Sequence, residues 1–335
     1  MNKNLYYTKK YEHNFSKNFY KYICKNKTLN KDVLEFIPKE KRDWDLIAKN
    51  VTLTEDFVTK YKTELLNHPK SLQQNKTLTY DRFLLIDKDE RDLILCSRNI
   101  ILCEKFIKRY KYEPLIVYLC SNPTITFKLL KLYNSDKKLY RYDLICKHAK
   151  LTLKVVKQIE KNYKESTFLK YEELSSNETL TLDMIIYLGI NNIHWNWCSI
   201  LSNIKLTKHL LLIKFNSPNL IDDGYLFAIS KNKHLTPEII EYIGPDKLDW
   251  KEVWKNVKLS ITFIKKYKKY LVLKFKWLRC NKSITFEIIE YLGNNLKWNW
   301  NLICSNINFS ETYNHFKILK TSYNKYSDIK FKFLN

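Results

Sequence analysis

The sequence predicts an all-α protein, an α-solenoid of about twelve repeats of roughly 25 residues, each with two short helices. Three observations support this fold class. One segment recurs along the whole chain at nearly fixed spacing. Each copy combines a helix N-cap with an apolar pattern of helical period. Glycine is scarce, with 4 residues, as expected of a chain with few strands and hairpins.

The clearest copy of the repeat contains a short capped helix that begins after Thr236. The Thr236 hydroxyl is a good N-cap acceptor, and Pro237 occupies the first helical position, where its missing N–H costs nothing. Leu235 and Ile240 have the spacing of a hydrophobic staple, and Gly244 closes the segment. A helix of about two turns is marginal alone, so neighbouring copies must hold it.

Every copy aligns on one residue four positions before the cap, which we call the anchor. The twelve anchors lie 23 to 29 residues apart, and eleven of them are asparagine. The cap position is Thr, Ser or Asn except at Cys103, and the residue before the cap is apolar in every copy. The anchors are Asn26, Asn50, Asn75, Asn99, Asn122, His148, Asn177, Asn203, Asn232, Asn256, Asn281 and Asn306.

A second apolar pair lies upstream of each anchor. The residue three positions before it is apolar or Cys in every copy, and the residue six positions before it is often aromatic. This spacing marks one face of a helix. Each repeat is therefore a short helix, an Asn-containing turn and a capped short helix. We expect an N-terminal cap or arm over 1–19, the array over 20–316 and a C-terminal cap or tail over 317–335.

Composition limits the environment of the protein. The eight cysteines form no C-x-x-C pair and mostly occupy repeat positions, which favours small buried side chains in a reducing compartment over disulfides or a zinc site. The N-terminus lacks the apolar segment of a signal peptide, and no run approaches the length of a membrane span. We expect a soluble protein inside a cell or a virion, with no membrane insertion. The sequence carries no signal for its oligomeric state.

The charge is the feature with most functional weight. Lys and Arg number 59 against 35 acidic residues, a net charge of +24, and residues 265–335 hold fourteen basic residues against four acidic ones. A patch of this kind on a solenoid suits a phosphate backbone. The alternative is a solvated lysine surface that partly reflects AT-rich codon usage, since Arg, the better reader of phosphate, is sparse. The candidate basic patch is Lys265, Lys266, Lys268, Lys269, Lys274, Lys276 and Arg279.

Other residues that suggest chemistry have structural explanations. Trp195 and Trp298 lie outside the aromatic register of the repeat and are candidate aromatic contacts for a base or a peptide; the alternative is that their rings pack in the core. The anchor Asn is expected to satisfy backbone groups in its turn. Cys146 and His148 occupy a core position and an anchor position, so they are not expected to be a catalytic pair. No catalytic, metal-binding or nucleotide-binding motif is present, and we expect neither an enzyme nor a cofactor.

Two Trp-containing segments and two turn segments carry a family resemblance. They are W-N-W-C-S-I-L-S-N from Trp195, W-N-W-N-L-I-C-S-N from Trp298, C-S-N-P-T-I-T from Cys120 and K-S-I-T-F-E-I-I from Lys282. They resemble the W-x-W…S-x-N-P-x-I-T helical repeat proteins of large nucleocytoplasmic DNA viruses (mimivirus-like). The resemblance covers about residues 20–316. It implies a viral origin and a helical-repeat fold, and it implies no activity.

These observations lead to a functional hypothesis. The chain is expected to be a non-enzymatic viral scaffold or adaptor that binds a viral or host protein, in the host cytoplasm or the virion. The first alternative is sequence-independent binding of RNA or DNA through the lysine-rich C-terminal face. The second is a minor structural component of the capsid.

Overall fold

The computed structural model describes residues 17–35, 37–111, 115–133, 140–162, 170–271, 275–278, 280–292 and 300–306. In these segments the regular structure consists of α-helices and short 3-10 helices, without strands. The predicted all-α class is confirmed. The helices form two rows, because each helix packs mainly on the helix two positions along the chain.

The first row consists of the helices that precede the anchors, and the second row consists of the capped helices that follow them. The first row is α2 (Lys17–Cys24), α4 (Trp44–Asn50), α7 (Pro69–Leu72), α9 (Leu93–Asn99), α11 (Ile116–Cys120), α13 (Tyr142–His148), α15 (Tyr171–Ser175), α17 (Trp197–Asn203), α19 (Asp223–Ser230), α21 (Trp250–Asn256), α23 (Phe275–Leu278) and α25 (Trp300–Asn306). The second row is α3 (Lys31–Glu35), α5 (Glu55–Lys60), α8 (Tyr80–Phe83), α10 (Glu104–Arg109), α12 (Phe127–Tyr133), α14 (Leu153–Asn162), α16 (Leu182–Tyr187), α18 (Lys208–Phe215), α20 (Pro237–Ile243), α22 (Ile261–Lys266) and α24 (Phe286–Leu292). One extra helix, α6 (Lys62–Leu66), joins α5 to α7.

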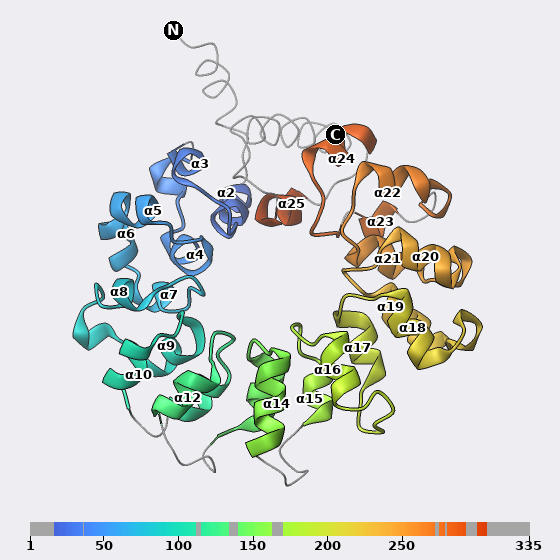
Figure 1. Ribbon diagram of the computed structural model, residues 1–335. Coiled ribbons are helices and arrows are strands. Elements are labelled where there is room, and N and C mark those ends of the chain that lie inside the picture. Colours follow the sequence, from blue (N-terminus) through green and yellow to red (C-terminus); the bar gives the residue numbers. More distant parts are fainter. Residues whose placement is uncertain are drawn as a thin grey trace, which may run out of the picture.

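The two rows curve into a ring in which α2 and α25, the first and last of the described helices, lie side by side (Figure 1). In the first row, α4 and α21 lie nearer the centre of the ring than their second-row neighbours α5 and α20. Helix α2 packs on α4 on one side and on α25 on the other. The array is therefore strongly curved, and its two ends lie side by side.

The capped helices begin where the repeat pattern predicts. Thr207 accepts a hydrogen bond from the backbone N–H of Leu210 at 3.1 Å, and Thr54, Thr181, Thr236 and Ser260 cap their helices in the same way. Cys103 makes no such bond. Thr79 occupies its cap position without making the side-chain bond, so the predicted caps work in most described copies and Cys103, the poor cap in the sequence, is also poor in the structure.

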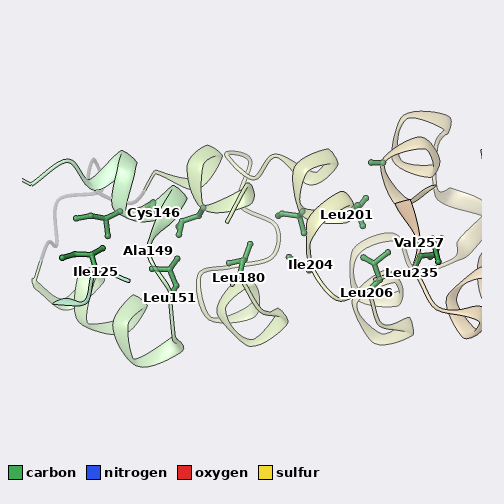
Figure 2. Close-up of a cluster of buried hydrophobic side chains, with 14 of the residues drawn as sticks. Ile125, Cys146, Ala149, Leu151, Leu180, Leu201, Ile204, Leu206, Leu235 and Val257 are labelled. Atoms are coloured by element: carbon green, nitrogen blue, oxygen red, sulfur yellow. The ribbon is translucent and has the colours of Figure 1, made fainter. Parts of the chain in front are cut away.

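The core is a continuous row of aliphatic side chains between the two rows of helices (Figure 2). The residues before the caps are buried in every described copy; Leu53, Leu206, Leu235 and Ile284 are each 3% or 4% exposed. The apolar residues three positions before the anchors are also buried, from Ile23 to Ile303. Each repeat therefore covers the apolar face of the next, which is what a solenoid of marginal helices requires.

Candidate functional site

The turns between the two rows alternate between two forms, which we call odd and even turns. The odd turns contain six buried anchors: Asn26, Asn75, Asn122, Asn177, Asn232 and Asn281. Asn122 is representative. Its Nδ2 donates to the carbonyls of Ser97 and Ile100 in the preceding repeat at 2.8 and 2.9 Å. Its Oδ1 accepts from the backbone N–H and the hydroxyl of Thr124 at 2.8 and 2.7 Å.

In the even turns, the first-row helix is seven residues long and runs to the anchor itself, as in α9. In four even copies the anchor Asn folds back on its own helix: Asn99 Nδ2 donates to the Leu95 carbonyl at 2.8 Å, and Asn50, Asn256 and Asn306 donate in the same way. The next residue is buried, as Ile100 is, and the odd Asn of the following repeat binds its carbonyl. Each odd turn thus clamps the even turn before it.

This alternation determines which side chains reach solvent at the turns. After an odd anchor, the next residue is exposed. After an even anchor, the next residue is buried and the one after it is exposed. We call the resulting surface the turn edge. Its exposed residues at these positions are Lys27, Thr52, Lys76, Ile101, Pro123, Lys150, Glu178, Lys205, Lys233, Lys258 and Lys282.

A groove of about 810 Å³ runs along the turn edge across the second to seventh repeats. We call it the first groove. Its lining includes one acidic residue, Glu178, and its basic residues come from four different turns. Lys147 forms an ion pair with Glu173 at 3.4 Å. The basic lining residues are Lys49, Lys76, Arg98, Lys147 and Lys150, with His148 between the last two.

The pKa of His148 reports on this electrostatic environment. Partial burial lowers the pKa of the imidazole below its usual value of 6.5, and the positive charges of Lys147, Arg98 and Lys76 lower it further. Glu173 opposes this shift. These effects favour the neutral form, and an anion placed in the groove would favour the protonated form.

A second groove of about 600 Å³ lies farther along the same edge. Its basic lining residues are Lys205, Lys233, Lys258 and Lys266. Lys233 donates to Glu178 of the first groove at 3.1 Å, so the two grooves meet at this ion pair. The pKa of His234, in the lining, is lowered by burial first and then by Lys233. Both grooves therefore present positive charge on one edge of the array.

The basic patch predicted from the sequence lies mostly away from these grooves. Of its members only Lys266 lines one, and it also pairs with Glu241 at 3.1 Å. Lys265 and Lys269 lie over the rings of Tyr291 and Tyr270, at 5.5 and 4.6 Å from the ring centroids. Lys268 is exposed in η8 (Lys268–Tyr270). The side chain of Lys276 is not described, and Lys274 and Arg279 lie outside the described residues.

The prediction of an aromatic contact at Trp195 is wrong. Its side chain is 5% exposed and packs edge-on against Tyr171, with the ring centroids 4.9 Å apart. Its Nε1 donates to the carbonyl of Gly189 at 2.9 Å. The turn at Gly189 thus supplies the polar partner that lets the indole enter the core. Trp298 lies outside the described residues.

Of the described cysteines, Cys24, Cys96, Cys120 and Cys146 are buried as expected, whereas Cys198 and Cys280 are exposed. Burial raises the pKa of Cys24, Cys120 and Cys146 to about 11, so these thiols stay protonated. Within the described segments, no three His, Cys, Asp or Glu side chains gather in a way that would hold a metal ion. None of the helices described has the length and apolar character of a membrane span.

The residues of the first groove did not stand out in the sequence, although a signal for them exists. The residue after the anchor is apolar in even copies, such as Val51 and Val257, and polar or Pro in odd copies, such as Lys76 and Lys233. This period of two repeats predicts which turn side chains are exposed.

Comparison with known proteins gave no match to a family model, a curated protein or a solved structure.

Proposed function

We propose that the chain is a non-enzymatic binding protein whose turn edge holds the phosphate backbone of a nucleic acid. The observation that carries this proposal is the first groove, which places five Lys and Arg side chains from the second, third, fourth and sixth repeats along one open edge. Two acidic side chains lie near them, and each is already engaged by a lysine, Glu173 by Lys147 and Glu178 by Lys233. Positive charges spread along one edge suit the row of negative charges on a phosphate backbone.

The chemistry of the groove favours the backbone over the bases. Sequence-specific recognition of single strands uses exposed aromatic side chains for stacking. The lining of the first groove contains no Phe, Tyr or Trp, and Phe263 in the second groove is 4% exposed. Contacts through Lys and Arg alone give affinity without sequence information. We therefore expect binding that depends on salt and hardly on sequence.

The same surface also fits the wider hypothesis of a scaffold for a protein partner, provided that the partner is acidic. A viral origin, and action in the host cytoplasm or the virion, remain part of this proposal through the resemblance of the repeats. An extended polyanion is favoured because cations from several repeats lie along the same edge. An acidic protein would need matching charges on an irregular surface.

The test compares two triple variants by fluorescence anisotropy on labelled duplexes and single strands of mixed sequence. One variant reverses three charges in the first groove, with Lys76, Arg98 and Lys150 each changed to Glu. The matched control reverses three charges outside both grooves, with Lys265, Lys268 and Lys269 changed to Glu. Both variants change the net charge equally, so only position distinguishes them.

The native chain should show a slope of log affinity against log salt of about −4 to −5, as expected for about five neutralised phosphates. The groove variant should lose on the order of 100-fold in affinity, and the control only a few-fold. Equal losses would show diffuse attraction rather than a groove. Absence of binding by the native chain at low salt, with recovery of an acidic protein on the native but not the groove variant, would establish the scaffold instead.

A further inference from the structure

The first and last described helices of the array, α2 and α25, contact each other as neighbouring first-row helices do elsewhere in the array. They are the two ends of the first row and pack against each other (Figure 1). At the start of an open array, the leading face of α2 would be exposed to water. Instead Tyr20 is 4% exposed, and Ile23 is fully buried. Ile303 of α25 is 3% exposed.

The first turn of the array has the odd form. Asn26 is 1% exposed, and its Oδ1 accepts from the backbone N–H and the hydroxyl of Thr28, both at 2.8 Å. Asn75 holds Thr77 in the same way, at 2.8 and 2.7 Å. In each of the five interior odd turns, the Asn side chain also clamps the even repeat before it. An odd turn is thus built to receive an even repeat.

The last repeat described has the even form. Helix α25 is seven residues long and runs to its anchor, and Asn306 Nδ2 donates to the Leu302 carbonyl at 2.8 Å. The even anchors Asn50 and Asn99 bind their own helices in the same way. Because twelve copies alternate, an array that starts with an odd copy ends with an even one. With an odd number of copies, both terminal copies would have the odd form, and the ends could not form an even-to-odd contact.

We infer that the contact between α2 and α25, which we call the seam, is a sixth even-to-odd joint, and that a second copy of this chain can complete it. The α25 end of one molecule then covers the α2 end of another, and the pairing is head-to-tail because the two faces differ. In a single molecule the connected ends have a high effective concentration, so closure within one chain prevails at low protein concentration.

The test uses two full-length variants that each lack one face of the seam. Ile23→Asp disables the α2 face, and Ile303→Asp disables the α25 face. Neither variant closes on itself or pairs with its own kind, but the mixture retains one intact face of each type. Ile193→Asp is the matched control, because Ile193 is 89% exposed and lies away from the seam. The measurements are light-scattering mass and small-angle X-ray scattering.

Each seam variant alone should remain a monomer of the 40.6 kDa chain mass with a larger radius of gyration than the native chain. An equimolar mixture should form a 1:1 dimer of twice that mass, and the control should match the native chain. An unchanged radius in both single variants would show that the seam does not hold the ring closed. A mixture that stays monomeric would overturn the pairing of two copies.

Loss of the fold is distinguished from opening of the seam by far-UV circular dichroism on the same samples. Where an Asp variant loses helix content, the milder pair Tyr20→Ala and Ile303→Ala replaces it. The same two outcomes then decide the inference, because opening increases the radius at constant helix content.

Discussion

The buried Asn of an odd turn offers the most quantitative test of how the repeats are joined. Changing Asn122 to Ala removes the two Nδ2 donors that reach the carbonyls of Ser97 and Ile100. Each buried carbonyl left without a partner costs about 1–3 kcal/mol, although Thr124 Oγ1 lies 3.4 Å from the Ile100 carbonyl and offsets part of one loss. We expect a loss of about 3 kcal/mol of unfolding free energy.

The matched control is Asn99→Ala in the adjacent even turn. The Asn99 side chain makes one half-buried hydrogen bond to its own helix, so its removal should cost about 0.5–1 kcal/mol. Asn122→Asp separates the two functions of the amide, because it keeps the acceptor for Thr124 and removes the donors. It should destabilise at least as much as Asn122→Ala.

Urea denaturation followed by far-UV circular dichroism measures these differences. Hydrogen exchange over 93–126 checks that the loss is local to the joint, as expected of an array whose repeats contact mainly their neighbours. Equal effects of Asn122→Ala and Asn99→Ala would refute the distinction between odd and even turns. If Asn122→Asp leaves the unfolding free energy unchanged, the two hydrogen bonds that Asn122 Nδ2 donates do not hold the repeats together.

Three further predictions concern other parts of the chain. A bound phosphate should raise the lowered pKa of His148, so affinity for a duplex should increase as the pH falls from 8 to 5.5, by about two- to fivefold, and His148→Gln should flatten this dependence in anisotropy titrations. In the native protein Cys146 should resist alkylation, because burial raises its pKa to about 11, whereas the exposed Cys198 should react; peptide mass spectrometry distinguishes the two. Gly244 has φ +102°, so Gly244→Ala should lower the unfolding free energy by about 1 kcal/mol in urea titrations; the result is contradicted if the change stabilises the chain.

The fold was predictable because it depends on features that every copy repeats. The apolar residue before the cap and the one three positions before the anchor recur in all twelve copies, and both are buried wherever they are described. Thr236 and Gly244 adopt the cap and the positive-φ end that their types favour. Averaging over copies reinforces such signals. It also conceals the alternation, since Asn75 and Asn99 look alike in sequence but have different roles.

The candidate site was harder to predict because it depends on which turn side chains face solvent together. The density of lysine in residues 265–335 suggested a patch there, yet charge density along the chain does not report neighbours in space. Lys76, Arg98 and Lys150 are far apart in sequence and line one groove, because the turns of successive repeats stack on one edge. Trp195 lies outside the aromatic register but is still buried, because the Gly189 carbonyl accepts a hydrogen bond from its Nε1. Sequence spacing does not reveal this partner.

Lysine footprinting tests the assignment of the binding edge most directly. Acetylation rates of individual lysines are measured by mass spectrometry with and without a saturating nucleic acid duplex. Lys49, Lys76 and Lys150 should be protected, whereas Lys265 and Lys268 should react at unchanged rates. Protection of Lys265 and Lys268 with unchanged rates at Lys49, Lys76 and Lys150 would contradict the proposed role of the turn edge.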